Sequence, residues 1–86
     1  MADYIINFAR SAIKELEALD APIVNRIFPK IESLAEEPRP PRCLKLVGEN
    51  DLWRIRIGDY RVLYSINDKK KIVEIVAVRH RREAYS

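Results

Sequence analysis

The 86-residue sequence has few of the residues from which metal, redox and nucleotide sites are built. It contains one cysteine, one histidine and two glycines. Cys43 has no cysteine to pair with and no clear base partner, so we expect a packed or semi-exposed thiol. A single histidine, His80, argues against a zinc site. Glycine occurs only at positions 48 and 58, which excludes a glycine-rich phosphate loop. We therefore expect no metal and no cofactor.

Long apolar runs are also missing. No stretch approaches the length of a membrane span, and charged residues interrupt the N-terminal region where a signal peptide would lie. With one cysteine, these features predict a cytoplasmic protein without a membrane partner. The 48% of hydrophobic residues is enough for one modest core without disulfides, so residues 1–86 are expected to form a single domain.

Charge is unevenly distributed along the chain. Residues 1–38 hold four Lys/Arg against seven Asp/Glu, whereas residues 39–86 hold twelve against six. The basic second half indicates a surface that faces a polyanion. A plain solvated surface with lysine-rich turns is the alternative, and charge alone does not separate the two.

The basic half contains the most informative stretch, residues 52–67, which reads LWRIRIGDYRVLYSIN. Apolar and polar residues alternate on both sides of Gly58-Asp59, which is typical of two half-buried strands joined by a two-residue turn. The expected core side carries Trp53, Ile55, Ile57, Tyr60, Val62, Tyr64 and Ile66. The expected open side carries Arg54, Arg56 and Arg61 together with Leu63 and Ser65.

The rest of the chain completes an α+β fold. Residues 3–8 predict a strand, residues 9–19 a helix capped by Asn7 or a near neighbour, and residues 22–37 a second helix with Pro22 in its first turn. Pro29 predicts a bend or break near residues 25–29. A proline-rich connector at 38–41 is followed by a strand at 43–47 and then by the two strands of the hairpin. The last strand, at 72–78, is expected to be central in the sheet. The order is β-α-α-β-β-β-β, with a helical hairpin on one face of a small, mainly antiparallel twisted sheet.

The open face has the chemistry of a phosphate-binding surface. Arginine presents a planar fork of donors that matches phosphate oxygens, and cations on a sheet with aromatic groups nearby suit single-stranded nucleic acid. The C-terminal residues RHRREAYS add Arg79, Arg81, Arg82 and Tyr85. Strand alternation groups Arg79 with Val73, Ile75 and Ala77, but it does not say which face these residues share.

Two phrases, WRIRIGDYRVLYSI and RHRREAYS, resemble the RelE family of toxin–antitoxin ribonucleases. The resemblance covers nearly the whole chain, from the first strand to the Arg…Tyr ending. It implies the α+β fold described above and cleavage of messenger RNA in the ribosomal A site. In this reaction the ribose 2′-OH attacks the adjacent phosphorus without a metal ion.

The resemblance also implies roles for individual residues. Arg61 would bind the scissile phosphate, and Arg79 would protonate the leaving group or stabilise its charge. Tyr85 would stack on a base and orient or deprotonate the 2′-OH. The remaining RNA- and phosphate-binding positions would be Arg54, Arg56 and Arg81.

One departure from the family affects the choice of base. Members often have lysines where Arg54 and Arg56 stand, and an arginine stays protonated where a lysine can lose its proton. The base role therefore moves to Tyr85. His80 is the alternative, although alternation with Arg79 points it to the other face.

The partners implied are a RelB-like antitoxin, the ribosome and mRNA, with DNA contacted only through the antitoxin. Two other functions stay open: a ParE-like toxin that inhibits DNA gyrase with the same fold, and an RNA-binding module without catalysis. Arg54 and Arg56 also fit a merely solvated sheet, and Tyr85 a packing anchor. The combination of Arg61, Arg79 and Tyr85 favours the ribonuclease.

Overall fold

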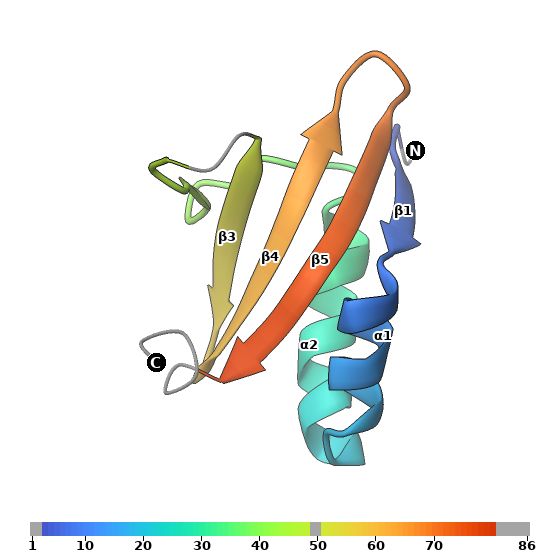
Figure 1. Cartoon of the computed structure of the whole chain (residues 1–86), viewed down its shortest axis with the longest axis vertical. Coiled ribbons are helices and arrows are strands. Elements are labelled where there is room, and N and C mark those ends of the chain that lie inside the picture. The colour runs from blue at the N-terminus through green and yellow to red at the C-terminus, as the bar shows by residue number, and fades with distance from the viewer. Residues whose placement is uncertain (1–2, 49–50, 81–86) are drawn as a thin grey trace.

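Two helices lie side by side against one face of a five-stranded sheet in the part of the chain that the computed structural model describes, residues 3–48 and 51–80 (Figure 1). The elements are β1 (Ile5–Phe8), α1 (Arg10–Glu17), α2 (Ala21–Ser33), β2 (Leu44–Lys45), β3 (Leu52–Ile57), β4 (Tyr60–Asn67) and β5 (Ile72–His80). This is the predicted α+β order, and the helices leave the opposite face of the sheet uncovered.

The sheet has the order β1-β5-β4-β3-β2. β1 runs parallel to β5, and all other neighbouring strands are antiparallel. The two helices lie between β1 and β2 in the chain and return it to the end of the sheet at which β1 begins. β5 was expected at the centre. It has a neighbour on each side, but the middle strand is β4.

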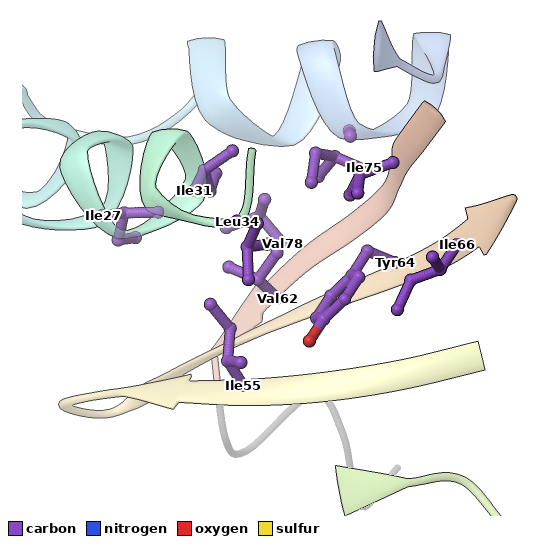
Figure 2. Packing of buried hydrophobic residues seen from close by; sticks show 11 residues of the cluster. Ile27, Ile31, Leu34, Ile55, Val62, Tyr64, Ile66, Ile75 and Val78 are labelled. Atoms are coloured by element: carbon purple, nitrogen blue, oxygen red, sulfur yellow. The ribbon is translucent and has the colours of Figure 1, made fainter. Parts of the chain in front are cut away.

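The predicted alternation in β3 and β4 is confirmed by burial. Ile55, Val62, Tyr64 and Ile66 are buried, and Figure 2 shows Ile55 and Val62 directed from their strands toward the helices. They pack against the buried side chains of the helical layer and of β5, which are Ala12, Ile27, Ile31, Leu34, Val73, Ile75 and Val78. The polar residues between them in β3 and β4 consequently belong to the opposite face.

Tyr64 is the largest fully buried side chain, and its hydroxyl has a partner in the connector. The hydroxyl donates a hydrogen bond of 2.7 Å to the carbonyl oxygen of Pro38. Burial raises the pKa of Tyr64 far above its ordinary value, so the phenol remains a donor. The proline-rich connector is thereby fixed against the centre of the sheet.

The first helix packs through Ala12, Leu16 and the following Leu19. Asn7 or a near neighbour was predicted as the cap. The N-cap is the near neighbour Ala9, which has extended backbone and makes no side-chain cap bond, so the prediction of Asn7 itself is wrong. Asn7 lies inside β1, where the parallel pairing with β5 fixes its backbone. The start of the helix is instead attached to the sheet, since the Ala9 N–H donates to the Ile75 carbonyl at 2.8 Å.

The second helix begins with Pro22 in its first turn, as predicted. A bend or break was predicted near residues 25–29. The helix runs unbroken through Pro29 to Ser33, so a break is wrong, and a bend stays a prediction. Pro29 has no N–H to donate to the carbonyl of Asn25, one turn earlier. Both residues are exposed, so water can donate to this carbonyl instead. Neither this helix nor α1, the two helices of the described residues, is long and apolar enough to cross a membrane.

Asp68, in the turn between β4 and β5, connects three distant segments. Its carboxylate accepts a hydrogen bond of 2.7 Å from the Tyr4 hydroxyl and bonds of 2.9 and 3.3 Å from the Arg39 guanidinium. These bonds, with Arg39 the larger contribution and Tyr4 the second, lower the pKa of Asp68 to about 2. The turn, the start of β1 and the connector are thus held together by one ionised carboxylate.

This arrangement predicts a pH-dependent stability. The pKa of Asp68 is lower in the folded state than its ordinary 3.8, so its contribution is complete above pH ~4 and is lost as the pH falls through about 2. We expect Asp68→Asn to lower the thermal midpoint at pH 6, and the difference from wild type to disappear as the pH approaches 2. Glu36→Gln, which removes an exposed carboxylate elsewhere, is the control. A constant difference across this range would contradict the assignment.

Candidate nucleic-acid interface

Three arginines lie in one row across the uncovered face. The strand register places Arg56 directly opposite Arg61, and Arg61 directly opposite Arg79. Residues directly opposite in a ladder point to the same face, so the three arginine side chains from β3, β4 and β5 share the uncovered face. The adjacent row consists of Leu44, Arg54, Leu63 and Ala77. We refer to Arg54, Arg56, Arg61 and Arg79 as the arginine face.

Arg79 reaches this face because β5 contains a bulge. Leu63 pairs with Ala77 but the next residue, Tyr64, pairs with Ile75, which leaves Val76 as an extra residue without a directly opposite partner. The bulge reverses the alternation of β5, so that Ile75 and Val78 are both buried against the helices. Arg79 then points to the arginine face instead of the core side, where unbroken alternation from Val73 would have placed it.

The arginine face is hollowed at its centre. A depression of about 160 Å³ is lined by Leu46, Arg54, Arg61, Leu63 and Arg79. Arg61 is only 8% exposed, although it is the middle member of the row. Guanidinium groups gathered this closely repel one another, and the apolar leucine side chains beside them lower the local dielectric. An anion with several oxygens, such as a phosphate, offsets this repulsion and matches the geometry of the donors.

The cationic surface continues past the depression. A second, shallower hollow is lined by Arg42, Arg54, Arg56 and Gly58, next to the turn between β3 and β4. Gly58 has a positive φ of 59°, whereas Asp59 after it does not, which is the pattern of the predicted type II′ turn. Arg54 lines both hollows, so it joins them into one groove that can follow a polyanion.

Glu15 of α1 also contacts this site, and the sequence analysis did not select it. One of its carboxylate oxygens accepts a hydrogen bond of 2.9 Å from the Val78 N–H, and the other lies 3.5 Å from the Arg79 Nε. A signal was present: Glu15 is three residues after Ala12 and four before Leu19, which places a carboxylate on the apolar stripe of the helix.

The predicted site residues divide into three groups. Four of them, Arg54, Arg56, Arg61 and Arg79, are together on the arginine face. Two others, Arg81 and Tyr85, lie outside the described residues. His80 pairs with Tyr60 and contacts its ring edge-to-face at 5.2 Å between ring centroids, on the side of the sheet that faces the helices. This is the side on which the alternation with Arg79 placed it.

The aromatic rings of the described residues lie on the other side of the sheet from the arginines. Tyr64 is in the core, and Trp53 and Tyr60 pack against it partly buried, as expected. The Trp53 ring lies under two cations from the connector and β2, Arg39 at 5.1 Å and Lys45 at 5.9 Å. No aromatic ring of residues 3–48 and 51–80 joins the arginine face, and the predicted base-stacking residue, Tyr85, lies outside the described residues.

Comparison with known proteins agrees with this architecture. The family model described as "ParE toxin of type II toxin-antitoxin system, parDE" matches residues 6–85. The chain belongs to this toxin family. This chain is 31% identical to the mRNA interferase toxin RelE of Escherichia coli over 87 residues. The match covers 96% of this chain and 90% of that relative. The resemblance to RelE toxins seen in the sequence is confirmed.

Solved structures of RelE toxins share the fold. The RelE–RelB complex from Pyrococcus horikoshii superimposes with a TM-score of 0.80 at 33% identity, covering 92% of this toxin and 96% of that chain. The intact Escherichia coli RelBE complex gives a TM-score of 0.79 at 28% identity, covering 90% and 95%. The two-helix, five-stranded mixed sheet is therefore the RelE fold.

Proposed function

We propose that this type II toxin is an endoribonuclease that cleaves messenger RNA in the ribosomal A site without a metal ion. The observation that supports it best is that Arg54, Arg61 and Arg79, from three neighbouring strands, line one depression, with Arg56 directly opposite Arg61 in the same row as Arg79. A relative of similar length and 31% identity is named an mRNA interferase, which supports the same reaction.

The proposed reaction needs no atom that the RNA does not supply. The 2′-oxygen of the ribose attacks the adjacent phosphorus as its proton leaves, and the bond from phosphorus to the 5′-oxygen of the next nucleotide breaks. That oxygen takes up a proton, so the products are a cyclic phosphate and a 5′-hydroxyl. Catalysis requires a proton acceptor, a proton donor, and positive charge next to the phosphorane oxygens.

The described residues fit the charge-stabilising part of this scheme. Arg61, at the centre of the row, binds the scissile phosphate, and Arg79 beside it stabilises or protonates the leaving 5′-oxygen. Arg54 and Arg56 neutralise neighbouring phosphates along the groove. Because a guanidinium is already protonated at physiological pH and cannot accept a further proton, none of these four residues is assigned as the base.

The base is assigned to the phenol of Tyr85, with Arg81 contacting the RNA backbone. Both roles come from the resemblance of RHRREAYS to RelE toxins. His80 was the alternative base, and its contact with Tyr60 on the helix side argues against it. Neighbouring guanidinium groups favour the ionised form of a phenol, which would bring its pKa closer to the working pH.

The proposed partner is a RelB-like antitoxin. The structures of similar toxins include complexes with RelB from an archaeon and from Escherichia coli. An acidic antitoxin matches the charge of the arginine face, and it would carry the contacts of the complex with operator DNA. Between episodes of inhibition the toxin would reside with this antitoxin in the cytoplasm, where ribosomes and mRNA are found.

Expression of the chain alone tests the proposal. We expect translation to stop and primer extension on cellular mRNA to show new 5′ ends within ribosome-bound codons. The family model carries the name ParE, so DNA supercoiling is to be measured in the same cells. Intact transcripts with failed gyrase supercoiling would establish the gyrase-inhibiting alternative, and RNA binding without new ends would leave only a binding module.

A further inference from the structure

α1 continues the hydrogen bonding of β5 where β1 stops. β1 ends at Phe8, opposite Ile75, so the next residues of β5 have no strand on that edge. The Ser11 hydroxyl donates to the Val76 carbonyl at 2.7 Å, and one helical turn later Glu15 accepts from the Val78 N–H at 2.9 Å. Two polar side chains of one helix face thus hold the bulge and the residues after it.

The Glu15 carboxylate does more than complete this edge. Its first oxygen is occupied by the backbone of residue 78, and its second lies 3.5 Å from the Nε of Arg79. Each carboxylate oxygen therefore has its own partner in β5. The Glu15 side chain is only 28% exposed, against 49% for the side chain of Arg79. A partly buried anion that is held in place restricts the rotamers of a neighbouring arginine more than a freely moving surface carboxylate does.

The contact also has a direction. Glu15 engages Arg79 through Nε, which leaves the two terminal nitrogens available to an anion, and the same arginine lines the hollow beside Arg61. Without Glu15, repulsion from Arg61 would favour rotamers that carry Arg79 away from the row into solvent.

We propose that Glu15 is a positioning residue that holds Arg79 in the orientation required for cleavage. The inference rests on the proposed ribonuclease function and adds to it a carboxylate that touches neither the phosphate nor the ribose. It acts through a second residue, so its removal should lower kcat and leave the KM for programmed ribosomes unchanged.

The test variant is Glu15→Gln, which keeps an acceptor for the Val78 N–H but loses the charge that attracts Arg79. We expect kcat for ribosome-bound mRNA to fall roughly tenfold, the size of coupling typical of contacting residues. Glu17→Gln removes the same charge from an exposed position of the same helix and should leave kcat unchanged. In an Arg79→Ala background, Glu15→Gln should have no further effect.

A second readout does not depend on activity. The Nε–H resonance of Arg79 in a nitrogen-15 spectrum of the toxin should shift in Glu15→Gln and stay in place in Glu17→Gln. Wild-type kcat in Glu15→Gln, an equal loss in the Arg79→Ala background, or an unmoved resonance would each overturn the inference. If the wild-type toxin cuts no mRNA, the proposed function fails first, and the resonance still decides separately whether Glu15 holds Arg79.

Discussion

Replacing Arg61 with alanine is expected to lower the rate of mRNA cleavage by a factor of roughly 10²–10³, which is the usual cost of removing one preorganised donor from a developing oxyanion. Arg61 is at the centre of the row and only 8% exposed, so no flexible neighbour can take its place at the phosphate. Primer extension on ribosome-bound mRNA, with purified toxin at saturating concentration, measures the effect.

Two comparisons make this result specific. Arg61→Lys keeps the charge but loses the planar fork, and should retain an intermediate rate. Arg10→Ala removes an arginine from the exposed start of α1 and should cut as wild type does. The thermal midpoint of Arg61→Ala should equal or exceed that of wild type, because the substitution relieves repulsion from Arg56 and Arg79. Full activity in Arg61→Ala would remove this residue from the site.

Replacing Tyr85 with phenylalanine is expected to reduce cleavage roughly 10²–10⁴-fold, the range that general acid–base catalysis contributes. The ring is retained, so binding to programmed ribosomes should change little while the chemical step slows. Tyr85→Ala removes the stacking ring as well and should weaken binding in addition. Single-turnover cleavage and a ribosome-binding assay separate the two effects.

Tyr60→Phe is the matched control for the loss of a phenol. Tyr60 packs against the core on the helix side of the sheet, away from the arginine face, so its variant should cut mRNA at the wild-type rate. If Tyr85→Phe is as active as Tyr60→Phe, the phenol is not the base and another group must accept the proton of the 2′-OH.

Much of the site was predictable because β3 and β4 are simple. Their alternation is strict, and a two-residue turn with Gly58 in the first position fixes the register between them. Once Ile55 and Val62 are assigned to the core, Arg56 and Arg61 must share the other face. Local periodicity and turn chemistry therefore determined three of the four members of the arginine face, all except Arg79, from the sequence alone.

The position of Arg79 was not predictable in this way. The run from Ile72 to Val78 is apolar almost throughout and contains neither glycine nor proline, so nothing in it indicates that Val76 is the extra residue. The bulge is defined by tertiary contacts, including the bond from Ser11 to the Val76 carbonyl. The same holds for Glu15, whose role depends on where β1 ends relative to β5.

At Pro29 the sequence predicts an interruption that the structure does not contain. Pro29 was expected to interrupt the second helix because an interior proline removes a helical hydrogen bond. The helix remains intact since Asn25, whose carbonyl lacks the Pro29 donor, is an exposed residue that water can reach, and buried Ile27 and Ile31 hold both halves against the sheet. Packing against the core outweighed a local preference that is read from sequence.

The unpaired Val76 has a consequence for how the gene can vary. Adding or removing one codon between Val76 and Arg79 would exchange the faces of Arg79 and His80, sending an imidazole toward the phosphate and a guanidinium toward the helices. A length change in the exposed turn after Asp68, at residues 69–71, lies before that point, where a loop can absorb it. Frame-preserving indels should thus be far less tolerated in the last third of β5 than in the turn that precedes it.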